Sequence, residues 1–127
     1  MTKARIGLKR VYEKPAADDG MRILVDRLWP RGIPKDKAKV DLWLKDIAPS
    51  HALRKRFHGK PADWDAFCAA YGAELENAAM EHAVKELRSH LRKRRVTLLY
   101  AARDEEHNNA VALLQWMRKG KAGQKGG

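Results

Sequence analysis

Two short stretches of the sequence concentrate the side chains that could perform acid–base or anion chemistry. The first covers residues 26–31, where Asp26, Arg27 and Arg31 surround Trp29 and Pro30. Proline lacks a backbone N–H and holds the preceding residue in extended geometry, so a strand can run no further than Trp29. Two guanidinium groups beside an indole at a strand end are suited to binding an anion or a nucleotide.

The second stretch follows an apolar run near the C-terminus. Its polar members are Tyr100, Arg103, Asp104, His107 and Asn108. His107 is the candidate general acid or base, with Asp104 and Asp26 as catalytic carboxylates, and the arginines would stabilise negative charge. The alternative is a structural network in which the same carboxylates and arginines pair with one another.

A third candidate anion site is the start of a short helix that we expect through Phe57. Ser50 is a favourable N-cap, the first turn has no acid, and Arg54 follows one turn later. The last helix is less suited to an anion because Asp104, which we expect to cap it, is followed by two glutamates. The favoured anion contacts are therefore Arg27, Arg31 and the Ser50 helix start.

Histidine spacing argues against a metal site. His51 and His58 would lie about 10 Å apart along a helix, too far to share one ion. Asp104 and His107 have suitable spacing but provide only two ligands. The sequence also lacks a Walker loop, a GxGxxG motif, a nucleophile elbow and zinc-finger spacing, so it indicates no particular cofactor.

Hydrophobic patterns predict the elements that must position these residues. Strands are expected over residues 4–12, 21–28 and 96–101, with helices over 50–57, 61–78, 81–93 and 104–117; residues 40–47 fit either a strand or one helical turn. This order predicts an α/β fold, a single domain with a small, largely parallel sheet covered by helices. If strands 21–28 and 96–101 are parallel neighbours, their polar ends meet where such sheets bind ligands.

Length and composition indicate one soluble domain. The chain has 127 residues, of which 44% are hydrophobic and 34% charged. We expect a single domain over residues 1–119 and a disordered, basic, Gly-rich tail over 120–127. No apolar run approaches a membrane span or a signal peptide, and the single cysteine, Cys68, is expected to be a buried core thiol, so the cytoplasm is the predicted location.

The formal charge of +11 raises a different possibility, a nucleic-acid-binding accessory protein. Basic side chains occur in the 35–39 loop, at 54–56, and in a run made of Arg92, Lys93, Arg94 and Arg95. Such groups could contact phosphates, although no motif that reads bases accompanies them and a solvated basic surface is the simpler alternative.

Three long motifs resemble the DUF488 family of small bacterial proteins, in particular its YeaO-like branch. They are Val25-Asp26-Arg27-Leu28-Trp29-Pro30-Arg31-Gly32, Asp41-Leu42-Trp43-Leu44-Lys45, and Thr97-Leu98-Leu99-Tyr100-Ala101-Ala102-Arg103-Asp104 followed by His107-Asn108. The resemblance extends from about Lys9 to Met117 and implies a cytosolic, single-domain α/β fold of unknown function. Other branches place cysteine and a histidine–arginine pair near the last strand, where this chain has Tyr100 and His107-Asn108, so cysteine chemistry is not expected here.

The favoured hypothesis is an anion-binding domain, with an enzyme acting on a nucleotide or another phosphorylated small molecule as its catalytic form. The sequence leaves open whether the domain turns over its ligand and how many copies assemble. Nucleic-acid binding through the basic surface is the alternative function.

Overall fold

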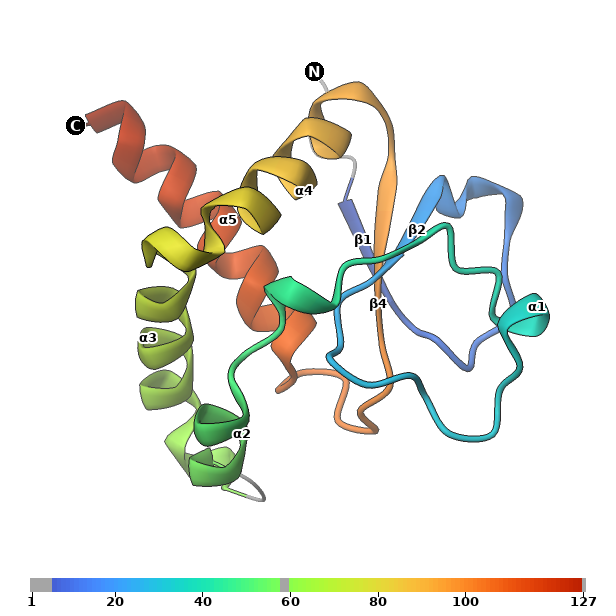
Figure 1. Cartoon of the computed structure of the whole chain (residues 1–127), viewed down its shortest axis with the longest axis horizontal. Helices are drawn as coiled ribbons and strands as arrows, with labels where there is room; N and C mark the ends of the chain where they lie inside the picture. The colour runs from blue at the N-terminus through green and yellow to red at the C-terminus, as the bar shows by residue number, and fades with distance from the viewer. Residues whose placement is uncertain (1–5, 58–59, 127) are drawn as a thin grey trace.

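The computed structural model describes residues 6–57 and 60–126, and these form one α/β domain (Figure 1). The strands are β1 (Ile6–Arg10), β2 (Met21–Leu24), β3 (Leu42–Trp43) and β4 (Val96–Tyr100). They make a parallel sheet in the order β1-β4-β2-β3. The predicted fold class is confirmed, and strands β2 and β4 are parallel neighbours, with Ile23 opposite Leu98.

Five α-helices accompany the sheet in the described residues. They are α1 (Lys35–Ala38), α2 (His51–Phe57), α3 (Trp64–Leu75), α4 (Glu81–Lys93) and α5 (Asn109–Gly126). Short 3-10 turns cover Ala17–Asp19, Lys45–Ile47, Pro61–Asp63 and Ala78–Met80. Figure 1 shows α2 to α5 on one side of the sheet, with α1 and its flanking loops on the other.

Strand β4 is central and buried on both faces, as its apolar sequence predicts. Val96, Leu98 and Tyr100 point to the main core beneath the helices, while Leu99 packs in a smaller cluster on the opposite face. Side chains of a strand alternate between faces, which separates the two sets. Both faces of the sheet are therefore closed along β4.

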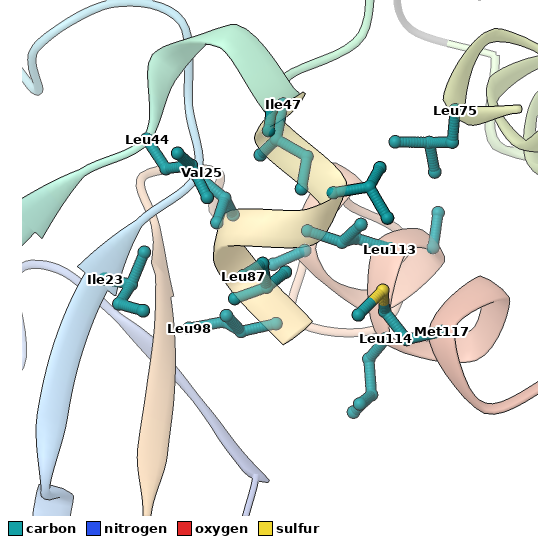
Figure 2. Close-up of a cluster of buried hydrophobic side chains, with 14 of the residues drawn as sticks. Ile23, Val25, Leu44, Ile47, Leu75, Leu87, Leu98, Leu113, Leu114 and Met117 are labelled. Carbon is teal, nitrogen blue, oxygen red and sulfur yellow. The ribbon is translucent and has the colours of Figure 1, made fainter. Parts of the chain in front are cut away.

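The main core joins the sheet to helices α4 and α5. Leu87 of α4 is fully buried and lies among side chains from the strands and from α5, including Ile23, Leu98 and Leu113 (Figure 2). The inner face of α5 is apolar, and its members Ala110, Leu113, Leu114 and Met117 are all buried. This core fixes the strand ends from which the polar loops emerge.

Strand β2 ends at Leu24, four residues earlier than predicted. The backbone N–H of Val25 still donates to Leu99, but the carboxylate of Asp26 then accepts the N–H of Ala101 at 2.9 Å. A side chain thus replaces the backbone partner, and the ladder stops. The ambiguous segment 40–47 contains both alternatives, the two-residue strand β3 followed by a 3-10 turn.

Helix α5 begins at Asn109, so the prediction that Asp104 caps it is wrong. The side chain of Asn108 accepts the N–H of Val111 at 3.0 Å and provides the cap. Asp104 instead folds the preceding loop by accepting the N–H groups of Glu106 and His107, each at 2.9 Å. The acidic residues 104–106 therefore precede the helix, and its first turn contains no acid.

Two further expectations concern Cys68 and the C-terminal tail. Cys68 is half-buried beside Gln115 and is not the fully buried thiol predicted, because its turn of α3 lies at the edge of the core. The backbone of α5 is described to Gly126, within the segment predicted to be a disordered tail, and the domain boundary at residue 119 stays a prediction. No helix in the described part of the chain has the length and hydropathy of a membrane span.

Candidate functional site

A cavity of about 610 Å³ lies beyond the carboxyl ends of β2 and β4. In Figure 1, α2 and the beginning of α3 lie at the same end of the molecule as the loop that follows β4. These elements form the walls, lined by Asp26, Arg27, Leu28, Ala48, Pro49, Arg54, Phe57, Lys60, Trp64, Phe67, Ala101, Ala102, Asp104, His107, Asn108 and Asn109. The two polar stretches do meet at one site, as parallel neighbouring strands require.

Asp26 is fixed where the two strands end. Its carboxylate accepts the Ala101 N–H, and its backbone carbonyl accepts the indole N–H of Trp43 at 2.8 Å. Burial raises the pKa of Asp26 above its ordinary value, although the Ala101 N–H, the Asn109 amide and the positive charge of Arg54 oppose that rise. The site thus contains a carboxyl group that holds its proton more tightly than an exposed aspartate.

Arg27 lines the cavity with few hydrogen bonds of its own. One terminal nitrogen, Nη2, donates to the carbonyls of Ala48 and Pro49 at 3.3 and 3.4 Å, both long. Its Nε is buried and has no hydrogen-bond partner among the described residues. Buried polar groups are normally satisfied, and guanidinium groups make their strongest hydrogen bonds to anions. Arg27 is therefore a cation with unused binding capacity.

Two further cations line the cavity, Arg54 from α2 and Lys60 from the segment before α3. Both residues are exposed to solvent. Arg54 is close enough to Asp26 to stabilise its charged form. Together with Arg27 they place three positive charges around one small volume, which favours an anionic occupant.

Aromatic side chains form another part of the wall. Trp64 and Phe67 lie one turn apart on α3 and stack with ring centroids 5.7 Å apart. Phe57, at the end of α2, meets Phe67 edge to face at 5.8 Å. All three are half-buried: they pack against the core and also line the cavity. The apolar residues of α3 therefore pack against the core, and those at the N-terminal end of the helix also line the cavity.

Asp104 and His107 form a pair on the cavity wall. The His107 Nδ1 lies 3.1 Å from a carboxylate oxygen of Asp104, and the His107 ring meets Trp64 edge to face at 5.1 Å. The backbone N–H groups of Glu106 and His107 lower the pKa of Asp104, and the His107 side chain adds to that effect. Asp104 therefore orients the imidazole, an arrangement compatible with acid–base chemistry or with binding.

The loop residues that follow this pair are also fixed by hydrogen bonds. The Asn108 side chain donates to the Asp104 carbonyl at 2.8 Å, and Asn109 donates to the Val25 carbonyl at 3.0 Å. Asn109 thereby joins the start of α5 to the end of β2. In the described residues no group of three or more His, Cys, Asp or Glu side chains could hold a metal ion, and His58 lies outside them.

Ser50, a predicted anion contact, does not line the cavity and is engaged by a carboxylate of the chain itself. Glu74 accepts the Ser50 backbone N–H at 2.9 Å and its hydroxyl at 2.5 Å. Ser50 is the predicted N-cap, since its Oγ accepts the Leu53 N–H at 3.1 Å. The sequence could not indicate this because Glu74 is distant in the chain and reaches Ser50 only through the packing of α3 against α2.

Four other predicted site residues lie outside the cavity lining. Trp29 belongs to the cluster on the opposite face of the sheet, where it meets Trp43 at 5.4 Å and donates to the Ile33 carbonyl. Arg31 and Arg103 are exposed and do not line the cavity, and Tyr100 is buried within β4. The early end of β2 explains why Trp29 and Arg31 lie outside the cavity lining, because the chain turns away from the cavity after Leu28.

Of the predicted residues, the cavity contains Asp26, Arg27, Arg54, Asp104, His107 and Asn108. Sequence reasoning missed Lys60, Asn109 and the aromatic wall. A usable signal was present for the last of these, because Arg54 with Phe57 and Trp64 with Phe67 are spaced one helical turn apart. That spacing puts each pair on one helix face.

Comparison with known proteins places the chain in a family. A family model described as "Inactive DUF488-N3 subclade" matches residues 5–126. The chain belongs to the DUF488 family. The resemblance seen in the sequence motifs is thereby confirmed, and two of those DUF488 motifs, residues 25–32 and 97–104, flank the cavity.

Individual DUF488 relatives match over most of their length. "Uncharacterized protein YeaO" of Escherichia coli K12 is 47% identical over 113 residues, which cover 89% of this chain and 96% of the relative. "Uncharacterized protein Rv3073c" of Mycobacterium tuberculosis H37Rv and "Uncharacterized protein Mb3100c" of Mycobacterium bovis are each 42% identical, covering 89% of this chain and 93% of theirs. No solved structure gives a significant match.

Proposed function

We propose that this DUF488 domain binds a small organic anion in the cavity beyond β2 and β4, with Arg27 as the principal contact. The observation that carries the proposal is the state of the Arg27 guanidinium, which has two long hydrogen bonds and a buried Nε without a partner in the described residues. Rotation of this group would replace weak contacts by charge-assisted hydrogen bonds to an anion.

The charges around the cavity support the same function. Arg27, Arg54 and Lys60 face two carboxylates, and one of these, Asp104, already has His107 as a partner. The other, Asp26, has a raised pKa because of burial. A volume of about 610 Å³ falls within the range of about 300–1,000 Å³ that is usual for small-ligand sites. A phosphorylated metabolite or a nucleotide, acting in the cytoplasm, fits these properties.

Binding without turnover is the form of the proposal that we favour. The family model that matches the chain is described as an inactive subclade, which supports a domain without catalytic turnover. A catalytic form would use His107 as the acid or base, oriented by Asp104, with Asp26 as a second carboxyl group. Turnover of a bound ligand, lost in His107→Ala, would establish that form.

A thermal shift experiment tests the proposal. The wild type is screened against inorganic phosphate, phosphorylated metabolites and nucleotides at two salt concentrations, because a ligand that binds only the folded state raises its melting temperature. Arg27→Ala should abolish the shift, whereas Lys55→Ala should retain it, because Lys55 is exposed on the same helix as Arg54 but outside the cavity. Equal shifts in wild type and Arg27→Ala would refute the site.

The nucleic-acid alternative has less support in the arrangement of its basic residues. Arg95 donates through Nε to the Asp18 carbonyl at 2.6 Å, and an Arg94 terminal nitrogen lies 2.8 Å from His90 Nδ1. Two of the four side chains in the run 92–95 thus have partners in the protein, which leaves Arg92 and Lys93. Stabilisation by oligonucleotides alone, only at low salt and lost in an Arg92→Ala/Lys93→Ala variant, would favour this alternative.

A further inference from the structure

We infer that the cavity selects one class of anion, a planar aromatic ring joined to an anionic group, of about the size of a nucleoside monophosphate. This inference rests on the proposed function, in which the cations bind the anionic group of the ligand. It adds the aromatic ring as the second part of the ligand that the cavity recognises. It is carried by the aromatic wall formed by Phe57, Trp64 and Phe67.

The aromatic wall consists of rings that the fold leaves partly uncovered. Phe67 contacts both Phe57 and Trp64, all three rings pack against the core on one side, and on the other they line the cavity. Half-buried apolar rings in a concave site gain stability when a ligand removes them from water. A flat ring is the best-matched cover because it can stack on a face or meet an edge.

The positions of the cations require that the ligand also carries a negative charge. Arg54 lies one helical turn before Phe57 on α2, and Lys60 lies four residues before Trp64. Both cations line the same cavity as the rings that follow them, and Arg27 completes the set. A ligand that uses both kinds of wall must therefore carry an apolar ring and a negative charge in one small molecule.

His107 adds a polar contact at the edge of the aromatic wall. Its ring meets Trp64 at 5.1 Å, and Asp104 engages Nδ1. Nε2 is therefore the ring nitrogen left for a ligand, and in the neutral imidazole with the proton on Nδ1 it accepts a hydrogen bond. A ring with an N–H donor on its edge satisfies this position better than a purely hydrocarbon ring.

Calorimetric titration with matched probes tests the selection. AMP is compared with ribose 5-phosphate, which lacks the aromatic ring, and with adenosine, which lacks the anionic group. Phenyl phosphate and indole-3-acetate represent other aromatic anions, and acetate is the non-aromatic counterpart of indole-3-acetate. We expect at least one aromatic anion to bind on the order of tenfold more tightly than its non-aromatic counterpart, in keeping with the usual strength of ring stacking. AMP preferred over phenyl phosphate would identify a nucleotide as the source of the ring.

A pair of tryptophan variants tests the wall itself. In Trp64→Leu the ratio of the affinity for AMP to the affinity for ribose 5-phosphate should fall towards one. The affinity for ribose 5-phosphate itself should stay unchanged. Trp116→Leu is the matched control, because Trp116 is also half-buried but lies outside the cavity and donates to Glu76. It should leave the preference intact. A loss of folding would instead change both affinities, which separates a structural effect from stacking.

The remaining outcomes distinguish failure of this inference from failure of the proposed function. Equal affinity for AMP and ribose 5-phosphate, with equal affinity for indole-3-acetate and acetate, would overturn the aromatic selection and leave the anion site standing. Adenosine bound as tightly as AMP would overturn both, because the anionic group would then contribute nothing. Absence of binding by every probe at millimolar concentration would also overturn both.

Discussion

The carboxylate of Glu74 accepts both the backbone N–H and the hydroxyl of Ser50, at 2.9 and 2.5 Å. Glu74 belongs to α3 and Ser50 precedes α2, so this contact ties together the two helices that carry the aromatic and cationic walls of the cavity. It also closes the N-terminus of α2 with a negative charge from within the protein, where the helix dipole favours one.

Removal of the Glu74 carboxylate should destabilise the domain. In Glu74→Ala the Ser50 N–H and the Ser50 hydroxyl lose their acceptor. We expect a loss of about 1–2 kcal/mol in the free energy of unfolding. Urea denaturation measures the change. A double-mutant cycle with Ser50→Ala should give non-additive losses, because both substitutions remove the hydrogen bond from the Ser50 hydroxyl to the Glu74 carboxylate. Strictly additive losses would show that the two side chains act independently.

The cap of α5 provides a second prediction, which contrasts two neighbouring polar residues. Asn108→Ala removes the acceptor for the Val111 N–H and should cost about 1 kcal/mol of unfolding free energy. Asp104→Ala should cost less, because its carboxylate organises an exposed loop and makes no contact with the helix N-terminus. Urea denaturation of both variants compares them, and a larger loss in Asp104→Ala would restore Asp104 as the cap.

Asp26 gives the domain a pH-dependent stability. Because burial raises the pKa of Asp26, the folded state holds this proton more tightly than the unfolded chain does. The stability gained in this way is fully present below the ordinary pKa of 3.8 and is lost as the pH rises through the raised pKa. Asp26→Asn stays neutral and keeps an oxygen for the Ala101 N–H, so it should gain stability over wild type as the pH rises.

Thermal denaturation of wild type and Asp26→Asn from pH 3 to pH 7 measures this difference. The melting temperature of the variant should rise relative to wild type across that range, and a constant or shrinking difference would contradict a raised pKa. The same substitution should strengthen anion binding at pH values above the raised pKa of Asp26, because there it removes a negative charge from the cavity wall.

Local sequence patterns predicted most of the fold for identifiable reasons. The continuous apolar run at 96–100 could only be a doubly covered strand, and the spacing of Val84 and Leu87 predicted a helix with the bounds observed for α4. Failures occurred where a side chain other than the expected group accepted a backbone N–H. Asp26 ended β2 by taking the Ala101 N–H, and Asn108 rather than Asp104 capped α5.

The sequence could predict those site residues whose position is determined by the end of a strand. Asp26 and His107 come together because β2 and β4 are parallel neighbours, which the sequence could suggest. Helical spacing puts Trp64 and Phe67 on one face of α3, but an apolar helix stripe gives no indication of which turn extends beyond the core. Lys60 has no local pattern that marks it as a site residue. Glu74 was likewise invisible, because its contact with Ser50 depends on helix packing.

The most direct test of the anion site is the NMR signal of the Arg27 Nε–H group during titration of uniformly ¹⁵N-labelled protein with AMP. Its absence from the spectrum of Arg27→Lys assigns the signal. We expect a saturable shift of this signal that follows the same binding curve as the calorimetric titration, because the guanidinium exchanges its long contacts for an anion. AMP binding that leaves the Arg27 signal unmoved would contradict it.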